Sequence, residues 1–361
     1  MTGLDTSNQL VMLQPSGQWH YPTANTSNAA PERIVGDVAI TLGGSNSTTL
    51  INLPGYISAA RIWFAEGDLQ FYTLSTEFGI ALVEPSAVNP SDPSADLNWG
   101  FAEFTYIEDA GVYADISFVD FVGTPLGMSL TDADGNTQDV GGLRADAVQT
   151  VCNGLVAQAA LDGYPWDDLC VYHPSGHPLR VLAPTDYLSI NNSAFDGYWT
   201  SYIDDVWARY TADTLWIDTQ ASNGKVGCTV DSGSNELTCT GDSRGYAQPT
   251  AADIFGCNSG PFAIWATDND IHRAVVPRLC AAFNRATLLM EGGDVQPSLS
   301  SDNYYTTSPT NHFSALVHKN EIDGKGYAFA YDDVEILGGS NQAGLVYASE
   351  PKVLTITVGG I

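Results

Sequence analysis

The chain has 361 residues, and its 42 acidic side chains outnumber its 13 basic ones, which gives a formal net charge of −29. So few lysines and arginines exclude nucleic acid and an anionic membrane surface as partners, because both must be neutralised by basic side chains. No stretch approaches the roughly 18 to 20 apolar residues of a membrane span. The apolar fraction of 44% can fill a core, so we expect a globular monomer whose partner is uncharged.

The first 140 residues are rich in short strand-like runs. These runs are β-branched or aromatic, and Gly, Pro, Asn and Asp bound them: AARIWFAEG, DLQFYTL, GIALVEPS, WGFAEFTYI and VYADISFVDFVG. The piece VNPSDPSADLNW between them is a polar, proline-rich loop. This part of the chain therefore predicts a β domain.

Apolar residues recur at helical spacing beyond residue 141, which predicts helices. Two such stretches are LRADAVQTVCNGLVAQAALDG and FDGYWTSYIDDVWARYTAD, and a third is HRAVVPRLCAAFNRATLL, which Pro277 should start or kink. From about residue 305 the pattern returns to strands, in HFSALVHK, GYAFAYDDV and VLTITVGG. We predict a mainly β protein in which residues 1–140 and 305–361 form a β domain, residues 141–304 form an inserted α/β domain, and a ligand cleft lies between them.

The six cysteines indicate disulfides and secretion, since their number is even and lysine is scarce. In KVGCTVDSGSNELTCTGD, Val230 and Leu237 face each other across a turn, and the same register pairs Cys228 with Cys239. The connectivity of the other four cysteines stays open. Three glycosylation tripeptides agree with secretion; they begin at Asn25, Asn46 and Asn191.

Several kinds of catalytic site have no signal in the sequence. His173 and His177 lie four residues apart, but the SGHP segment beside them indicates a loop, and no Cys/His cluster suggests a metal. There is no nucleophile elbow, no P-loop and no dinucleotide fingerprint. We therefore expect no metal and no cofactor. Carboxylates and aromatic rings remain, and these are the side chains that handle sugars.

A predicted hairpin at residues 99–128 carries acidic residues inside its strands. Alternation places one set of residues on a shared face of the first strand, namely Phe101, Glu103, Thr105 and Ile107, and another on a shared face of the second, namely Tyr113, Asp115 and Ser117. Asp120 falls on the opposite face unless a bulge intervenes. Acids that point into one cleft could hydrolyse a glycoside, one protonating the leaving oxygen and one activating water. The alternative is that they lie on a solvated sheet face.

The hairpin resembles the thaumatin-like superfamily. ARIWFAEG resembles its G-R-x-W-x-R strand and FAEFTY its L-A-E-F-T-L strand, which places Arg61 and Glu103 on the family's cleft arginine and glutamate. VYADISFVDFVGTPLGM places Asp115 and Asp120 on two of its cleft aspartates, and YAFAYDDV and LTITVGG resemble its last strands. The dense disulfide framework of the plant proteins is missing, including the cysteine after R-x-W-x-R-T.

The whole chain is similar to glycoside hydrolase family 64, whose members are β-1,3-glucanases with a thaumatin-like β domain and an α/β domain. The motifs are EFTY, ISFVDFVG followed by PLG, FGCNSGPF, PRLCAAFNRATLL and AYDDV, and within the family the chain looks like a fungal member. The resemblance implies an endo-acting β-1,3-glucanase that inverts the anomeric centre and is secreted or bound to a cell wall. Glu103 would be its general acid and Asp120 its general base.

The resemblance also implies sugar contacts. The family's contact positions fall on Thr105, Tyr113 and Ser117, with Tyr113 in place of the usual Trp, and Asp115 stands where many members have Asn. Arg61 could orient an ionised carboxylate or pair a strand-end acid structurally. Other functions stay open: a non-catalytic thaumatin-like protein that binds β-glucan or is antifungal, a structural wall protein, or a glycosidase for another linkage such as β-1,6. The inserted helical domain favours the enzyme, because it would turn a shallow cleft into a groove.

Overall fold

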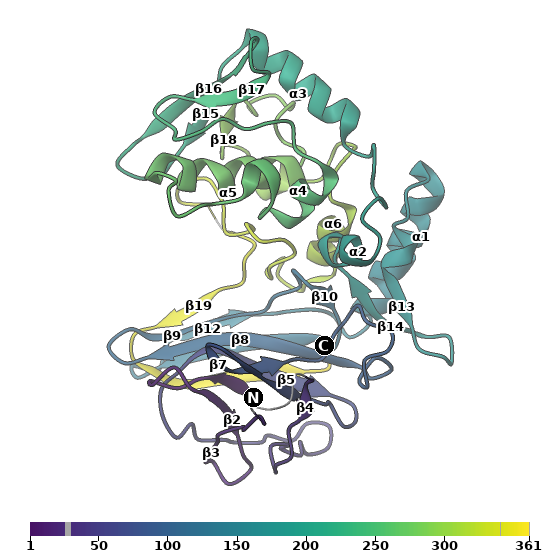
Figure 1. The fold of residues 1–361 in the computed structure, drawn as a ribbon, viewed down its shortest axis with the longest axis vertical. Helices are drawn as coiled ribbons and strands as arrows, with labels where there is room; N and C mark the ends of the chain where they lie inside the picture. Colours follow the sequence, from purple (N-terminus) through teal and green to yellow (C-terminus); the bar gives the residue numbers. More distant parts are fainter. Residues whose placement is uncertain (26–29, 340, 361) are drawn as a thin grey trace.

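The computed structural model describes residues 1–25, 30–339 and 341–360. Figure 1 shows a lower lobe built of sheets and an upper lobe in which helices surround a smaller sheet. Helices α4 and α5 lie on the side of the upper lobe nearest the lower one, and α1, α2 and α6 lie beside the junction (Figure 1). The protein is therefore mainly β with several sheets and some helices, as expected.

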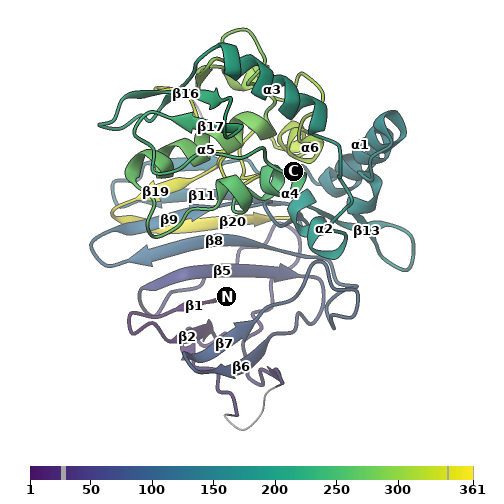
Figure 2. The same cartoon turned by 45° about the horizontal axis from the view of Figure 1, so that its top comes forward.

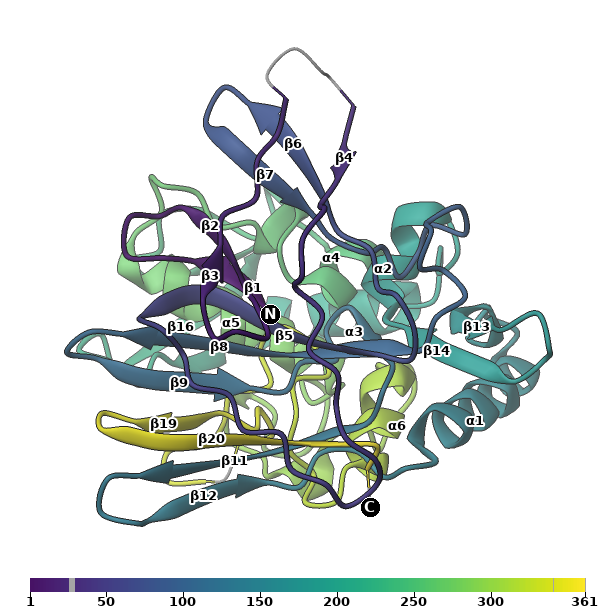
Figure 3. The same cartoon turned by 90° about the horizontal axis from the view of Figure 1, so that it is seen from below.

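A seven-stranded sheet forms most of the lower lobe, in the order β19-β9-β8-β5-β1-β2-β3. Figure 2 shows these strands in succession from β1 to β9, and Figure 3 shows a second sheet, β12-β11-β20, whose strands run in nearly the same direction. In β11, Leu126, Met128 and Leu130 are buried and alternate with less buried polar residues after Met128. This is the pattern of a strand with one face on a core.

The strands of these two sheets are β1 (Thr2–Leu4), β2 (Leu10–Leu13), β3 (Trp19–His20), β5 (Ile57–Ala65), β8 (Trp99–Ile107), β9 (Gly111–Asp115), β11 (Leu126–Asp132), β12 (Thr137–Val140), β19 (Val346–Ala348) and β20 (Pro351–Val358). Two small sheets adjoin them. One contains β4 (Glu32–Arg33), β6 (Tyr72–Thr76) and β7 (Gly79–Val83), and the other contains β10 (Phe121–Val122), β13 (Cys170–Tyr172) and β14 (Pro178–Leu182).

The upper lobe has a sheet in the order β17-β16-β15-β18. Its strands are β15 (Leu215–Asp218), β16 (Lys225–Asp231), β17 (Glu236–Cys239) and β18 (Val295–Gln296). The α-helices of the chain are α1 (Ala147–Asp162), α2 (Pro184–Ile190), α3 (Thr200–Ala212), α4 (Ala251–Gly256), α5 (Asp270–Asn284) and α6 (His312–Asn320). Short 3-10 turns are η1 (Asp167–Leu169), η2 (Gly260–Phe262) and η3 (Ser301–Asn303). The three predicted helices are present as α1, α3 and α5, and Pro277 lies inside α5 rather than at its start.

The prediction that HFSALVHK is a strand is wrong, because this segment forms α6. Asn311 caps the helix by accepting a hydrogen bond from the Ser314 amide at 3.1 Å. Phe313 and Val317 are buried one turn apart, which is helical spacing. A side chain at Gly154 of α1 would collide with Leu316, so glycine there lets α1 and α6 pack closely.

The prediction of a strand at GYAFAYDDV is also wrong. The Asp332 carboxylate accepts hydrogen bonds from the backbone amides of Ala328 and Phe329, at 2.7 and 3.1 Å, and this curls the segment into turns. Tyr327 still forms one isolated parallel bridge, with Ser117. The last predicted strand, VLTITVGG, is confirmed as part of β20.

Three disulfides join the six cysteines. Cys228 and Cys239 face each other in the β16–β17 register and are bonded, as predicted. The other bonds link α1 to β13 through Cys152 and Cys170, and α4 to α5 through Cys257 and Cys280. Each bond therefore closes a loop within the region that was predicted as the insertion. Of the tripeptide that begins at Asn25, residues 26 and 27 lie outside the described residues.

Helices long and apolar enough to cross a membrane do not occur among residues 1–25, 30–339 and 341–360.

Candidate active site

Strand pairing brings the predicted cleft residues into two cross-strand rows. Arg61 of β5 lies opposite Glu103 of β8, and Glu103 lies opposite Asp115 of β9. Residues that face each other in adjacent strands project from the same side of a sheet. These three charged side chains therefore share one face. On the same face, a second row joins Thr105, Tyr113 and Tyr347.

Arg61 binds two carboxylates at once. Its Nε donates to Glu103 Oε1 at 2.9 Å, and its Nη1 donates to Glu84 Oε2 at 2.6 Å. About a third of each carboxylate side chain is exposed, 34% for Glu103 and 33% for Glu84. The guanidinium carbon also lies 4.5 Å from the Phe101 ring centroid. Arg61 thus orients Glu103, and Glu84 competes with Glu103 for its positive charge.

Asp115 has no cation opposite it. Its burial and the neighbouring charge of Glu103 raise the pKa of Asp115 to about 7. The pKa of Tyr327 is raised chiefly by burial, then by the charge of Asp333, and then by the charge of Asp115. The segment after α6, which contains Tyr327, therefore approaches Asp115. Asp115 therefore supplies a carboxyl group that holds its proton close to neutral pH.

Asp120 lies where the chain leaves the large sheet. The prediction of a strand that continues past Ser117 is wrong, because β9 ends at Asp115 and the chain bends at residues 119–120 before β10. Strand alternation alone would place Asp120 on the face opposite Asp115 unless a bulge intervened, and this bend takes the place of the bulge. Asp120 also anchors the inserted region, because its backbone carbonyl accepts a hydrogen bond from Ala183 N at 2.8 Å, just before α2.

The charges of these acids act on one another. Burial chiefly raises the pKa of Glu84, Arg61 opposes the shift, and Glu103 and Asp120 add to it. We call Arg61, Glu84, Glu103, Asp115 and Asp120 the hairpin cluster. The structure brings all four predicted charged residues into it and adds Glu84, which sequence reasoning missed. The sequence signal for Glu84 was weak, because Glu84 is only a single acid directly after the apolar run of β7.

Asp186 is a second residue that sequence reasoning missed. It lies in the first turn of α2, and burial together with the charge of Asp120 raises the pKa of Asp186 to about 7. The sequence carried one usable sign, a proline at the helix start with an acid in the first turn, directly after the buried strand β14. Asp186 brings a carboxyl group from the inserted region toward the hairpin cluster.

An aromatic surface lies beside the acids. The ring centroids of Tyr113 and Tyr347 lie 4.4 Å apart, with an angle of 32° between the ring planes. Tyr113 is 42% exposed and Tyr347 is 40% exposed. Tyr347, which was not predicted, thus places a second partly exposed ring beside that of Tyr113. Hydroxyls of the predicted contact residues also serve the fold: Thr105 Oγ1 accepts from Ala59 N at 3.3 Å, and Ser117 Oγ accepts from Val119 N at 3.4 Å.

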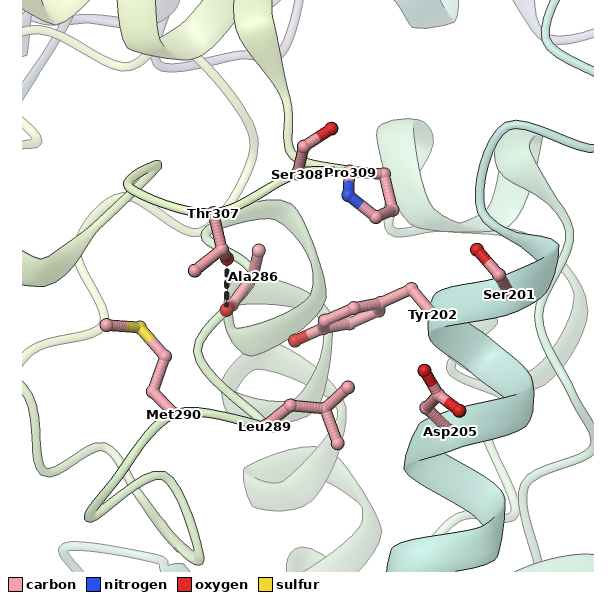
Figure 4. Close-up of a pocket in the computed structure, with 9 residues that line it drawn as sticks. All are labelled: Ser201, Tyr202, Asp205, Ala286, Leu289, Met290, Thr307, Ser308 and Pro309. Carbon is pink, nitrogen blue, oxygen red and sulfur yellow. Dashed lines mark hydrogen bonds between the residues drawn. The ribbon is translucent and has the colours of Figure 1, made fainter.

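A separate pocket of about 220 Å³ lies in the upper lobe, between α3 and the segments that follow α5 (Figure 4). Tyr202, Asp205 and Met290 are among the residues that line it, and none of its lining residues belongs to the hairpin cluster. In the described part of the chain, no group of three or more His, Cys, Asp or Glu side chains has the arrangement of a metal site.

Comparison with known proteins places the chain in a family. The sequence model of a family described as Beta-1,3-glucanase matches residues 1–358. A glucan endo-1,3-beta-glucosidase of Cellulosimicrobium cellulans is 27% identical over 310 residues, and one of Arthrobacter sp. (strain YCWD3) is 26% identical. The matched region covers 82% of this chain and 52% of each relative, so the chain spans about half the length of these curated relatives.

Solved structures agree with the family match. The crystal structure of a laminaripentaose-producing beta-1,3-glucanase in complex with laminaritetraose superposes with a TM-score of 0.82 and 27% identity, covering 99% of this chain and 92% of that one. A beta-1,3-glucanase domain from Clostridium beijerinckii shares the fold, with a TM-score of 0.73 and 21% identity over the same shares of both chains. The similarity of the whole chain to glycoside hydrolase family 64 is thereby confirmed, and the chain belongs to this family, the β-1,3-glucanases.

Proposed function

We propose that this protein is an endo-acting hydrolase that cleaves β-1,3-glucan with inversion at the anomeric carbon. The observation that carries the proposal is the row Arg61–Glu103–Asp115 on a sheet face that also bears the exposed pair Tyr113 and Tyr347. Asp120 lies near enough for its charge to act on Arg61 and Glu84. Acids beside an aromatic surface suit a neutral sugar polymer. The family match and the relatives' names support β-1,3-glucan as the substrate.

In the proposed reaction, Glu103 donates a proton to the glycosidic oxygen, and the bond from that oxygen to the anomeric carbon breaks. Asp120 removes a proton from a water molecule that attacks this carbon from the opposite face, so the configuration inverts. Inversion requires about 6.5–9.5 Å between the two carboxyl groups, which leaves room for the water. Arg61 fixes Glu103 Oε1 from one side, so the other carboxyl oxygen is the one that faces the leaving group.

The remaining acids and rings would set the substrate in place. Asp115 and Asp186, whose carboxyl groups stay protonated to about pH 7, can donate hydrogen bonds to sugar hydroxyls. Tyr113 and Tyr347 provide a surface for a pyranose face, with Thr105 directly opposite Tyr113. Ser117 lies beyond the end of β9, where it forms a bridge with Tyr327. No metal and no cofactor has a part in these steps.

Further features belong to the same proposal. The lower lobe would be a thaumatin-like β domain of residues 1–140 and 305–361, and residues 141–304 the inserted α/β domain, with the glucan in the cleft between them. The protein would be a monomer of fungal origin, secreted or held in the cell wall, without nucleic acid or membrane partners. Three disulfides and the strong negative charge support an extracellular setting.

The test is hydrolysis of matched polysaccharides by the purified protein. We expect soluble oligosaccharides from linear β-1,3-glucan, and none from β-1,4- or β-1,6-glucan. Glu103→Gln should bind the β-1,3 chain without cleaving it. Binding without hydrolysis by the wild type would make it a non-catalytic glucan-binding protein, and cleavage of β-1,6-glucan alone would show that the linkage is wrong.

A further inference from the structure

A tryptophan with an exposed ring lies on the upper lobe, outside the hairpin cluster. Trp265 is 56% exposed, the highest value among the chain's eight tryptophans, all of which lie within the described residues. Together with Ile264, which is 38% exposed, it forms the apolar tip of residues 264–267, between η2 and α5. A single exposed apolar residue is ordinary on a protein surface. What sets Trp265 apart is how firmly its surroundings hold it.

The backbone of Trp265 is bonded on both sides. Its amide donates to Asp268 Oδ2 at 2.6 Å, and its carbonyl accepts from Arg273 Nη2 at 2.9 Å. The Asp268 side chain is only 2% exposed and also accepts from Arg244 Nε at 3.0 Å. Hydrogen bonds to charged groups are the strong ones, so the tip is fixed in place although it is exposed.

The ring of Trp265 is supported on one face. The guanidinium carbon of Arg244 lies 4.2 Å from the ring centroid, which is a cation–π contact. Arg244 is itself held, because it donates to the Ala263 carbonyl and to both carboxylate oxygens of Asp268. Arg244 therefore backs one face of the indole and leaves the other face for a ligand.

The other exposed tryptophan of the upper lobe has a different setting. Trp216 of β15 is 43% exposed, but its ring lies over Gly227 of the neighbouring strand, with ring carbons 3.3 and 3.5 Å from where a side chain on Gly227 would begin. That ring therefore covers its own sheet. An exposed tryptophan is therefore not always available to a ligand. Trp216 is exposed but covers its own sheet, so it serves as the matched control for Trp265.

We propose that Trp265 is a stacking platform for a glucosyl unit of a β-1,3-glucan chain, extending the binding surface from the hairpin cluster onto the upper lobe. The C–H groups on a pyranose face pack on an indole ring, and a ring held in place loses little freedom when it binds. Residues 264–267 lie between η2 and α5, and Figure 1 shows α5 on the side of the upper lobe nearest the large sheet. The inference rests on the proposed function, because it takes the glucan as the ligand.

Binding should be measured in the Glu103→Gln background, so that the chain is not cleaved. Linear β-1,3-gluco-oligosaccharides of increasing length are titrated by calorimetry against this parent and against Trp265→Ala and Trp216→Ala added to it. Trp265→Ala should weaken binding of long oligosaccharides about tenfold, the order expected for one lost ring contact. Trisaccharide binding should stay as in the parent, since a short chain does not span both lobes. Trp216→Ala should bind every length as the parent does.

Two further readouts separate binding from a merely structural role. In the otherwise wild-type enzyme, Trp265→Ala should raise KM for long chains about tenfold with kcat preserved, and Trp265→Phe should restore most of the loss. Unchanged affinity of Trp265→Ala at every length would overturn the platform. So would an equal loss in Trp265→Ala and Trp216→Ala, or one accompanied by a lower melting temperature. A parent that binds no β-1,3-glucan would overturn the proposed function itself.

Discussion

Two charged groups in this protein differ in how completely their carboxylates are neutralised. In the group that we call the buried cluster, Asp332 lies 3.3 Å from Arg285 Nη2 and 3.2 Å from His318 Nε2, and Glu321 lies 2.8 Å from His318 Nδ1. Burial alone would lower the pKa of His318, but these two carboxylates raise it to about 10. The cluster thus holds two cations against two carboxylates.

The hairpin cluster has one cation, Arg61, against the carboxylates of Glu84, Glu103, Asp115 and Asp120. One guanidinium therefore stands against four acidic groups on a partly exposed face, and of these Asp115 keeps its proton up to a pKa of about 7. Such an arrangement is unfavourable for folding, since like charges in one place repel. The contrast indicates that the buried cluster serves stability. Under the proposed function, the hairpin cluster keeps acids available for the reaction at the cost of stability.

The largest expected effect is on activity. Glu103→Gln and Asp120→Asn should each lower the hydrolysis rate by about 10²–10⁴-fold, the usual contribution of a general acid or base. Neither change should lower the melting temperature, because each removes a charge from a crowded negative site. The check is reducing-sugar release together with thermal unfolding. Near-normal activity in either variant would remove that residue from the mechanism.

The buried cluster should respond in the opposite way. Asp332→Ala leaves Arg285 without a carboxylate partner in a dry site, leaves His318 with Glu321 alone, and removes the acceptor for two backbone amides, so it should destabilise the fold by about 3–5 kcal/mol. Urea unfolding at pH 7 measures this. The control is Asp302→Ala, at an exposed position of η3. A loss no larger than in the control would mean that the buried cluster does not stabilise the protein.

Asp115→Asn should make the protein more stable near neutral pH, by about 1–2 kcal/mol after allowance for partial exposure. The folded protein holds the Asp115 proton up to about pH 7, whereas the unfolded chain releases it near the ordinary value of 3.8. The folded state therefore binds more protons between these values, so stability falls as the pH rises through this window. The gain should be present at pH 8 and absent at pH 3.5 in paired thermal melts. A gain that is the same at both pH values would contradict the assigned cause.

The smallest effect is on the pH dependence of catalysis. Glu84→Gln leaves the Arg61 guanidinium to Glu103, and an undivided ion pair favours the ionised form of an acid. The alkaline limb of the pH–rate profile should therefore move to lower pH by about half a unit. Glu108→Gln, an exposed acid in the turn after β8, removes the same charge without touching Arg61. The idea fails if both variants shift the limb equally.

The site was predictable where it depends on strand alternation and short motifs. Glu103, Asp115 and Arg61 belong to regular antiparallel strands, so their common face follows from a period of two residues. Placing Asp120 required knowledge of where β9 ends. Just beyond that end, Phe118 N donates at 2.6 Å to the carbonyl of Tyr327, a residue far away in the sequence. Glu84 and Asp186 had only weak local signals and Tyr347 was not predicted, because all three reach the site through contacts between segments that are distant in sequence.

The errors in the fold have a similar origin. HFSALVHK is short enough to fit either a strand or a helix, and packing against α1 over Gly154 decides for the helix. GYAFAYDDV is rich in aromatic and small residues, but the Asp332 carboxylate takes backbone amides that a strand would have used. In contrast, the β16–β17 hairpin and its disulfide were predictable, because the turn fixes the register of adjacent residues.

The most direct test of the account is the anomeric form of the first product. Linear β-1,3-glucan is mixed with the wild-type enzyme in the proton NMR tube, and the new reducing ends are followed before mutarotation mixes them. Glu103 as acid and Asp120 as base on opposite faces of the sugar predict that the α-anomer appears first. A β-anomer that appears first would mean a covalent intermediate on one carboxylate, and would contradict the roles assigned to this pair.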